Sequence, residues 1–493
     1  MRRVASGILP IIAIDRKAQK PLHRQIYDGF RAAIVDGNLH PGQRVPSTRV
    51  LAIELGVSRF PVLNAYAQLL AEGYFEGRVG AGTVISTSLP DQMTRGVPTA
   101  AGSKVSYLGP RPVAHRTSLF SGIDVKPWQR GPGAFRIGQV AFDHFPLKVW
   151  SNLVARHCRN MGAVSTHYRN PMGSEAFRQT IARYLRTARS LRCDASQIMI
   201  VNGSQQALEL TARVLLNSGD RVWMEEPGYW LARSVFALAG CRLVPVPVDE
   251  QGLSVEAGIR MSRKARAAFV TPSHQFPLGV TMSASRRFQL LEWAHNTGSW
   301  VIEDDYDSEY RFESLPIASL QGLDTKARVI YIGTFSKVLF PSLRIGYIVI
   351  PADLVDRFNS VRLIMDVGPP DFFQHVIADF MSEGHFARHL RRMRVLYREQ
   401  RSALVDSISD ELGSMVEVLG DEAGMHLPVA MTRRASDLAI AERAARHNLW
   451  LWPLSPYYAG EPSRCGFVMG FGGTRVEEIR PAVQLLRKLM TLM

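Results

Sequence analysis

The chain has 493 residues, of which 46% are hydrophobic and 21% are charged. This composition is ordinary for a folded protein and excludes a wholly disordered or collagen-like chain. At ~100–200 residues per domain, the length predicts two to four domains. The four cysteines have no CxxC spacing, which argues against a zinc ribbon or a redox dithiol and fits a reducing compartment. The net charge of +15 favours a polyanionic partner.

The positive charge is concentrated near the N-terminus. Residues 1–86 contribute +5 and residues 87–134 contribute +4, which leaves only +6 for the rest of the chain. Residues 87–134 are rich in Pro, Gly, Ser and Thr and show no sustained period, which is typical of a linker. We therefore predict a small basic domain over residues 1–86, a linker over 87–134 and a large domain over 135–493.

Three amphipathic segments in the basic domain predict a small helical bundle. The first follows Pro21 and ends near Gly37, with apolar residues at a spacing of four, namely Leu22, Ile26, Phe30 and Ile34. Ser47 and Ser58 can each cap a further helix, and Gly56 between them provides a tight turn. Two helices joined by a short glycine-containing turn are typical of a helix-turn-helix.

A hairpin and three arginines extend this pattern. Residues 74–86 predict two short strands around a glycine-rich turn, which would form a wing. Arg49 lies on the second predicted helix, Arg59 on the first turn of the third, and Arg78 at the wing. A DNA-binding surface needs such cations and helix N-termini on one side. An ordinary three-helix bundle remains the alternative interpretation of the pattern alone.

The run from Pro21 to Ser86 resembles the winged helix-turn-helix of GntR-type repressors over its whole length. The resemblance implies that four residues contact DNA, namely Arg49, Ser58, Arg59 and Gly80. Where that family usually has a polar residue followed by Thr, this chain has Phe60-Pro61. Pro is tolerated in a first helical turn. Phe cannot donate a hydrogen bond to a base but can contact a thymine methyl, so the base preference is open at this position.

From about Phe135 onward, apolar strands alternate with helical patterns. Strand-like runs such as QIMIV, DRVWMEE, RAAFV, WVIEDD and ARVIYIG are each separated by helical segments. This alternation predicts an α/β domain with a mostly parallel sheet. Ligands in such sheets bind beyond the C-terminal ends of the strands, where the chemically distinctive residues of this chain cluster.

Two of these strand ends carry polar motifs. Residues 201–206 close a strand and open a helix, where small residues let backbone N–H groups reach an anion, although an ordinary strand-to-helix turn is the more common explanation of such a segment. Residues 302–307 end an apolar strand in four acids and a tyrosine. A solvated loop or a metal site are alternatives there. Because no histidine lies at ligand spacing beside these acids, we predict no metal.

A third strand end carries a lone lysine. Lys337 follows a strand, flanked by the hydroxyls of Thr334 and Ser336, and Arg344 lies seven residues further on. Pyridoxal phosphate needs such a combination, because a lysine forms the Schiff base while hydroxyls and an arginine hold the phosphate. It also needs a carboxylate on the ring nitrogen, which the acidic strand end can supply.

The segment from about Phe135 to Gly473 resembles a fold-type I aminotransferase. The segments that carry the resemblance are YRNPMGSEAFRQTIARYLR, NGSQQALEL, EEPGY, TPSHQFPLGVTMSASRR, IEDDYDSEYR and GTFSKVLFPSLRIGY. With the N-terminal domain, nearly the whole chain resembles the MocR/GabR class of transcriptional regulators. This implies a multidomain fold: a mainly helical winged helix-turn-helix plus a large α/β domain of the pyridoxal-phosphate-dependent transferase type.

The resemblance also implies roles for individual residues. Lys337 is the catalytic lysine that forms the Schiff base with pyridoxal phosphate. Asp304 pairs with the pyridinium nitrogen, with Asp305 as the nearest alternative, and Tyr306 pairs with the 3-oxygen. The implied phosphate ligands are Ser204, Gln205, Thr334, Ser336 and Arg344.

Three further positions complete the implied site. Tyr229 stacks on the cofactor ring, and either His274 or Gln275 lies near the 3-oxygen. Tyr168 matches the tyrosine that reaches the cofactor phosphate of a partner subunit. That match implies a homodimer with a domain-swapped arrangement and shared sites.

Two departures bear on the ligand. Aminotransferases usually hold the substrate carboxylate with an arginine just before a small C-terminal strand, and this chain has Val468 there, with Arg464 nearby as a possible substitute. The GABA-responsive members have an arginine two residues after the stacking tyrosine, and this chain has Leu231. We therefore do not expect GABA to be the effector.

These features predict a cytoplasmic, nucleoid-associated regulator that binds a double-stranded DNA operator. Its large domain would sense a small amino compound through pyridoxal phosphate and would carry out no physiological turnover. One alternative is an active pyridoxal-phosphate-dependent aminotransferase with an appended DNA-binding domain. Another is a protein that senses pyridoxal phosphate itself. No run reaches the ~18 apolar residues of a membrane span, so we expect no membrane role.

Overall fold

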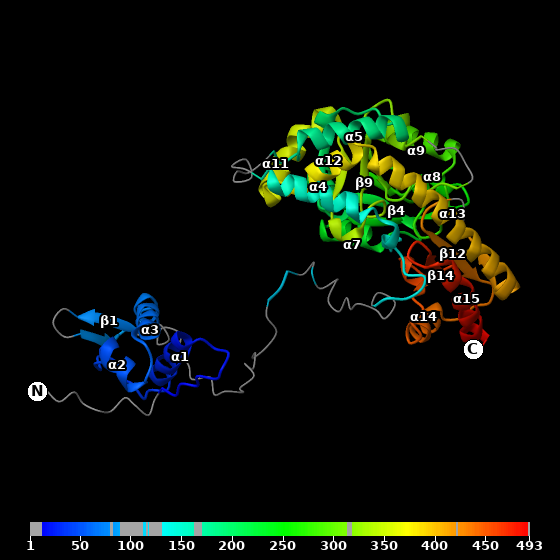
Figure 1. Ribbon diagram of the computed structural model, residues 1–493. Helices are drawn as coiled ribbons and strands as arrows, with labels where there is room; N and C mark the ends of the chain where they lie inside the picture. The colour runs from blue at the N-terminus through cyan, green and yellow to red at the C-terminus, as the bar shows by residue number, and fades with distance from the viewer. Residues whose placement is uncertain are drawn as a thin grey trace, which may run out of the picture. The chain divides into compact units, whose positions relative to one another are not determined.

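The computed structural model describes residues 12–78, 82–88, 112–114, 117, 131–161, 170–312, 318–420 and 423–491. The chain divides into two units, Met1–Pro112 and Val113–Met493 (Figure 1). Gly80, Tyr168 and most of the predicted linker lie outside the described residues. In the part of the chain that is described, no helix is both long enough and apolar enough to cross a membrane.

Three helices and an antiparallel hairpin form the small unit. Its elements are α1 (Leu22–Val35), α2 (Thr48–Glu54), α3 (Arg59–Ala71), β1 (Phe75–Arg78) and β2 (Gly82–Ile85). Ser47 Oγ accepts a hydrogen bond from the backbone N–H of Val50 at the start of α2, and Gly56 turns the chain with a φ of +62°. Ser58 occupies the N-cap position of α3, but its hydroxyl makes no capping hydrogen bond. The winged helix-turn-helix predicted from the sequence is confirmed.

Three aromatic rings form the centre of the small unit. Phe30 of α1, Tyr66 of α3 and Phe75 of β1 pack edge to face, with ring centroids 5.1–5.6 Å apart. The apolar side of α1 that the spacing of four predicted is buried around them, including Ile26 and Ile34. This core contacts only the inner side of α3 and leaves the outer side exposed.

An eight-stranded mixed sheet lies at the centre of the large unit, counted over its described residues. Its strand order is β3-β10-β9-β8-β7-β4-β5-β6. The bounds are β3 (Ile198–Val201), β4 (Arg221–Glu226), β5 (Arg242–Asp249), β6 (Gly252–Leu253), β7 (Ala267–Val270), β8 (Trp300–Asp305), β9 (Val329–Thr334) and β10 (Gly346–Val349). The strands from β9 to β5 are parallel, whereas β10 and β6 are antiparallel to their neighbours. The predicted βα alternation is thus confirmed.

Helices cover both faces of this sheet, because successive strand residues point to opposite faces (Figure 1). Ile302 packs with α6, α7 and α11, whereas Val301 packs with α8, α9 and α10 on the other face. Beyond them on that second face, α5, α12 and α13 cover β3 and β10, and α4 packs on α12. The bounds are α4 (Leu147–Arg159), α5 (Glu175–Ala188), α6 (Ser204–Leu215), α7 (Trp230–Leu238), α8 (Val255–Ser262), α9 (Ala284–Thr297), α10 (Leu320–Leu323), α11 (Val355–Asp366), α12 (Phe372–Ser382) and α13 (His385–Leu412).

A smaller antiparallel sheet follows α13. Its order is β11-β12-β14-β13, with bounds β11 (Val416–Val418), β12 (His426–Met431), β13 (Trp452–Pro453) and β14 (Gly466–Gly470). Helices α14 (Asp437–Ala445) and α15 (Val476–Thr491) pack beside it together with α13. Its central strands place His426 opposite Gly470, at the end of β12 that faces the large sheet's polar strand ends.

The end of the predicted linker and the residue that follows it are bonded to this C-terminal part. Ala134 forms a β-bridge with Leu449, and the backbone N–H of Trp450 donates to the carbonyl of Ala134 at 2.9 Å. Phe135 is fully buried, and its N–H donates to Thr474 Oγ1 at 3.0 Å. Residues 131–134, at the end of the predicted linker, are therefore held by the large unit.

Candidate functional site

A cavity of about 520 Å³ lies at the C-terminal ends of β7, β8 and β9. The starts of α6 and α7 and parts of the C-terminal sheet complete its wall. Eight of the residues predicted from the sequence line it: Ser204, Tyr229, Asp304, Tyr306, Thr334, Ser336, Lys337 and Arg344. Parallel strands bring these side chains together because their carboxyl ends meet at one edge of the sheet.

Lys337 follows β9 and is half-buried in this cavity. Burial lowers the pKa of its amine, and the charge of Arg344 lowers it further, whereas the carboxylates of Asp307 and Asp304 oppose both effects. A lowered pKa increases the fraction of neutral amine, which is the nucleophilic form. The backbone of Gly138 comes so close that a Cβ there would lie 2.5 Å from Lys337 Nζ. Glycine at this position leaves room for the amine.

The two consecutive acids at the end of β8 have different environments. Asp304 lines the cavity, whereas Asp305 points to the other face of the sheet. Asp305 Oδ2 is 2.8 Å from Arg189 Nη2, and it accepts hydrogen bonds from Ser308 and Tyr331. Asp305 is thus committed to the interior of the domain, and the geometry favours Asp304 as the carboxylate that serves the cavity.

The pKa of Asp304 is raised well above that of an ordinary aspartate. Burial, together with the negative charges of Asp305, Asp307 and Glu225, raises its pKa to about 7. Its Oδ1 atom is buried and has no hydrogen-bond partner among the described residues. A buried carboxylate oxygen without a partner is costly. A protonated nitrogen placed in the cavity would remove that cost.

An anion-binding cradle lies at the start of α6. Gly203 forms the N-cap with a φ of +86°, and Ser204, the first residue of the helix, lines the cavity, so the N-terminus of α6 lies at its wall. Arg344 Nη2 donates to the carbonyl of Asn202 at 3.1 Å, and a Cβ at position 203 would lie 3.1 Å from the same guanidinium. The hydroxyls of Ser204 and Ser336 line the same part of the wall. This combination of helix dipole, arginine and hydroxyls suits a phosphate.

Two predicted cofactor residues, Gln205 and His274, do not line the cavity but contact residues that do. Gln205 is absent from the cavity lining, and its Nε2 donates to the hydroxyl of Tyr229 at 3.3 Å. His274 is likewise behind Tyr306, whose hydroxyl is 3.0 Å from His274 Nδ1. Gln275 is engaged elsewhere, because its amide donates to the carbonyls of Pro227 and Phe276. Of the two alternatives near the 3-oxygen, the geometry therefore favours His274, acting through Tyr306.

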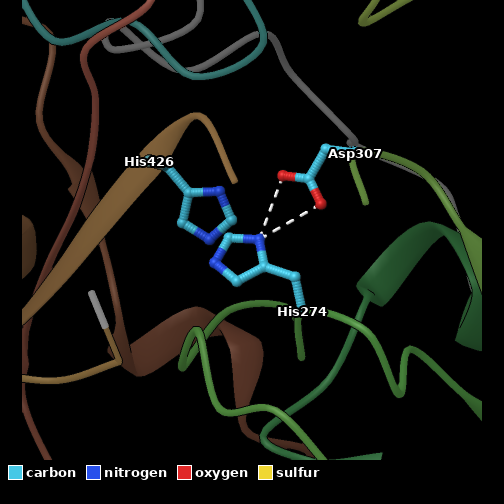
Figure 2. Close-up of side chains that lie close together, drawn as sticks. All are labelled: His274, Asp307 and His426. Atoms are coloured by element: carbon cyan, nitrogen blue, oxygen red, sulfur yellow. Dashed lines mark hydrogen bonds and ion pairs between the residues drawn. The ribbon is translucent and has the colours of Figure 1, made fainter. Parts of the chain in front are cut away.

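His274 lies between Asp307 and His426, as Figure 2 shows. Its Nδ1 is 3.0 Å from Asp307 Oδ2, and the two histidine rings are 4.5 Å apart between centroids. The Nε2 atoms of both histidines are buried and lack partners among the described residues. Burial, with the charges of His274 and Lys337, holds the pKa of His426 well below its usual range, so this imidazole is neutral.

The side of the cavity away from the cradle differs from an aminotransferase substrate site. Val468 on β14 is fully buried and contributes no charge. Arg464 is exposed and absent from the cavity lining, so it does not replace the missing arginine there. Arg136 does line the cavity, and one of its Nη atoms donates to the carbonyl of Gly131 at 2.8 Å.

Large apolar and aromatic side chains form the rest of this side. Leu231, which the sequence singled out, is among the lining residues. The others on this side are Trp230, Phe276, Met425, Trp452 and Tyr457. Sequence reasoning missed Arg136, Met425, Trp452 and Tyr457, because they come from distant segments that carry no motif. It also did not predict Trp230 and Phe276, although they directly follow Tyr229 and Gln275 in the chain.

The residues present fit pyridoxal phosphate. A lysine amine, a carboxylate oxygen without a partner and a phosphate-type cradle surround one cavity. A nitrogen cation would satisfy Asp304, and a phosphate would satisfy the N-terminus of α6 and Arg344. The donor set thus matches both ends of the cofactor.

Comparison with known proteins agrees with this geometry. Residues 134–474 match the family described as aminotransferase class I and II, and residues 22–85 match bacterial regulatory proteins of the gntR family. The probable rhizopine catabolism regulatory protein MocR of Rhizobium meliloti is 40% identical over 97% of this chain and 95% of its own length. The chain belongs to the MocR-type transcriptional regulators.

Other MocR-type regulators and solved structures extend the comparison. The pyridoxine biosynthesis regulator PdxR of Corynebacterium glutamicum is 30% identical over 95% of this chain and 96% of its own length. The structure of LysN, an alpha-aminoadipate aminotransferase from Thermus thermophilus, has 26% identity and a TM-score of 0.71 over 77% of this chain and 98% of LysN. This MocR-type chain is a DNA-binding regulator with an aminotransferase-like domain, and pyridoxal phosphate is its expected cofactor.

Proposed function

We propose that the cavity holds pyridoxal phosphate in the orientation set by Asp304 and Arg344, and that an amino compound entering it controls binding of the small unit to an operator. The unpartnered, buried Oδ1 of Asp304 carries this proposal, because a protonated ring nitrogen would satisfy it. When bound, the cofactor supplies an electrophilic carbon that condenses with amines and a ring that takes up electron density.

The residues of this chain supply position and proton control. Arg344 and the start of α6 would hold the phosphate, and Asp304 would keep the ring nitrogen protonated. Burial lowers the pKa of the Lys337 amine, which increases the fraction of its nucleophilic, neutral form. Tyr306 provides a hydroxyl whose hydrogen bonding is shared with His274 and, through it, with Asp307. Apolar and aromatic side chains line the cavity beside these groups.

The first test is spectroscopic. The purified chain is mixed with pyridoxal phosphate, its absorbance is recorded before and after borohydride reduction, and the labelled peptide is identified by mass. A band that borohydride removes, with the label on Lys337, supports the proposal. A chain that binds no cofactor, or one labelled elsewhere, contradicts it.

Regulation requires that the amine prefer one arrangement of the protein over another. A ligand shifts an equilibrium only by its differential affinity for the two states. DNA affinity is therefore measured with the cofactor-free protein, with pyridoxal phosphate alone, and with pyridoxal phosphate plus each of a set of amines. A change at the third step supports an amine effector, whereas a change complete at the second step supports sensing of pyridoxal phosphate.

Turnover is the competing activity. The lysine and the cradle are retained, so an exchange of amino groups is chemically accessible. The buried Val468 and the exposed Arg464 leave the predicted carboxylate position without an arginine, which disfavours amino-acid substrates. Sustained keto-acid formation over many turnovers with an amino donor would favour the aminotransferase alternative over the regulator.

The proposal includes a homodimer. Support comes from exposed apolar side chains on the large unit, where Ile364 is 85% exposed and Leu363 is 52% exposed on α11. Large exposed apolar side chains of this kind are typical of interaction surfaces. Light scattering should give twice the mass of the chain, and Ile364→Glu should shift the mass toward that of one chain. A wild-type mass equal to one chain contradicts the dimer.

A further inference from the structure

The helix α3 is apolar on both of its sides. Val62, Ala65, Tyr66 and Leu69 are buried in the core of the small unit. On the opposite side Phe60 is 69% exposed and Leu63 is 41% exposed, and Asn64 and Ala67 are also exposed. These four positions follow at spacings of three, one and three, so they form one stripe along the helix. We name residues 60, 63, 64 and 67 the outer stripe of α3.

An outer stripe of this composition is unusual for a surface helix. A helix that is apolar all round is ordinarily buried, and large apolar side chains gathered on a surface mark an interaction site. In the outer stripe, Asn64 is the single residue with a hydrogen-bonding side chain. The stripe therefore has the composition of a surface that contacts a partner mainly through apolar groups.

The nearby arginine is directed toward α2. Arg59 Nε donates to Thr48 Oγ1 at 3.1 Å, which joins the first turn of α3 to the first turn of α2. Arg49 is exposed on that same turn of α2. The cations thus gather where the two helices begin, a position suited to phosphates. The outer stripe is therefore free to contact the groups of the partner that lie between its phosphates.

We propose that the outer stripe of α3 reads A·T base pairs in the DNA major groove. Phe60 and Leu63 would contact thymine methyl groups, and Asn64 would form paired hydrogen bonds with an adjacent adenine. The thymine methyl is the one apolar group that a base pair presents in that groove, and Asn is a preferred partner of adenine. This inference rests on the DNA binding of the regulator family and deepens it by naming the bases.

The alternative occupant of the stripe is another protein surface. DNA is favoured because residues 1–86 contribute a charge of +5, because Arg49 and Arg59 lie at the N-terminal end of the stripe, and because the N-terminal residues of the second helix of a helix-turn-helix contact base edges. A protein partner would not require this positive charge beside an apolar stripe.

The experiment begins with the full-length chain loaded with pyridoxal phosphate. Bound duplexes are selected from a random-sequence pool, and the tightest duplex is then remade with each thymine replaced in turn by deoxyuridine. That replacement removes one methyl and leaves the hydrogen bonds of the base unchanged. We expect losses of about four-fold in affinity at two or more positions in each half-site, which corresponds to one buried methyl group.

Variants then assign the methyl contacts to residues. In Phe60→Ala and Leu63→Ala the deoxyuridine penalty should vanish at the matching thymines, and in Asn64→Ala the preference for adenine should be lost. Leu70→Ala is the matched control, because Leu70 is also 41% exposed on α3 but lies two turns further from the N-terminus. It should bind as the wild type does.

Three outcomes would overturn the proposal in distinguishable ways. If no duplex is retained from the pool, DNA binding itself fails and the readout fails with it. If a duplex is retained but every deoxyuridine substitution is neutral, DNA binding stands and the methyl readout is wrong. If Phe60→Ala changes the mass of the protein in solution but not its base preference, the stripe is a protein contact. Methyl-dependent binding that Phe60→Ala abolishes is the supporting result.

Discussion

The two units place opposite kinds of residue where they function. The small unit exposes apolar side chains on α3, with Phe60 69% exposed, whereas the large unit buries acids and histidines around its cavity, with Asp304 only 4% exposed. Both choices oppose the usual distribution of residues between surface and core, and both have a cost in the free protein. An apolar side chain at the surface, or an acid in the interior, is therefore a better guide to the ligand than a residue in its usual environment.

The largest expected effect separates the two units. Lys337→Ala should abolish the borohydride-sensitive absorbance band completely, because no other amine among the described residues lines the cavity. Binding of the selected duplex should remain measurable, since the lysine lies outside the DNA-binding unit. Absorbance and a DNA titration on the same sample check both statements. Loss of DNA binding in a folded, cofactor-free variant would show that the small unit depends on the occupied cavity.

A matched pair of acids sharpens the description of the cavity. Asp304→Asn should weaken cofactor binding by about 10- to 100-fold, the effect of losing one charged hydrogen bond. Asp305→Asn should instead lower the free energy of unfolding by about 3–5 kcal/mol, because Arg189 would be left buried without its charge partner. Cofactor titration and urea denaturation separate the two. Equal effects on both readouts would mean that the two acids are not divided as the geometry indicates.

The pH dependence of stability tests the burial of Asp304 directly. Its pKa rises from 3.8 to about 7 in the folded, cofactor-free protein, so between these values the folded state holds a proton that the unfolded state has lost. Stability therefore falls as pH rises through this window, by up to about 4 kcal/mol. Glu225, Glu303 and Glu309 act in the same direction.

Because those acids act together, the measurement is a difference. Unfolding free energies are taken from about pH 5 to about pH 8 for the wild type and for Asp304→Asn, both without cofactor. The variant should have the shallower decline. Parallel curves would mean that Asp304 titrates near its ordinary pKa and that its buried oxygen is solvated.

The contrast within the small unit is between phosphate and base contacts. Arg59→Ala should weaken binding to all duplexes alike and lower the slope of log affinity against log salt by about one, as expected for a phosphate contact. The cofactor absorbance should not change. A variant that binds the selected duplex as tightly as the wild type would contradict the assignment of α3. A variant that loses preference for particular bases would make Arg59 a base reader.

The smallest effect on the cofactor is expected for His274, which does not line the cavity. His274→Asn should retain the cofactor but shift the pH midpoint of the imine absorbance by less than about one unit, because His274 contacts the hydroxyl of Tyr306 instead of the cavity itself. A pH titration of the absorbance measures this. Loss of cofactor binding would instead show that His274 is a direct ligand.

Local signals in the sequence predicted much of both units. The spacing of α1, the cap at Ser47 and the turn at Gly56 were readable because each depends on neighbouring residues. The strand ends that carry Asp304 and Lys337 were readable because parallel strands converge at one edge. Fold, cofactor and family therefore followed from short motifs.

The rest depended on contacts between distant segments. His426 reaches His274 only because β12 returns to the cavity after α13. Arg136 reaches the cavity only because the start of the domain is bridged to Leu449. The engagement of Arg59 by Thr48 depends on the angle between α2 and α3. No periodicity or spacing in the sequence encodes such contacts.

The bridge between Ala134 and Leu449 fixes the end of the predicted linker to the large unit. Two residues further along the chain, Arg136 begins the segment that lines the cavity. Release of residues 131–134 from this bridge would add about 14 Å of extended chain to the tether. Half-sites one helical turn apart are separated by about 34 Å. In the proposed homodimer, release of these few residues would therefore change which operator spacings the two DNA-binding units can span.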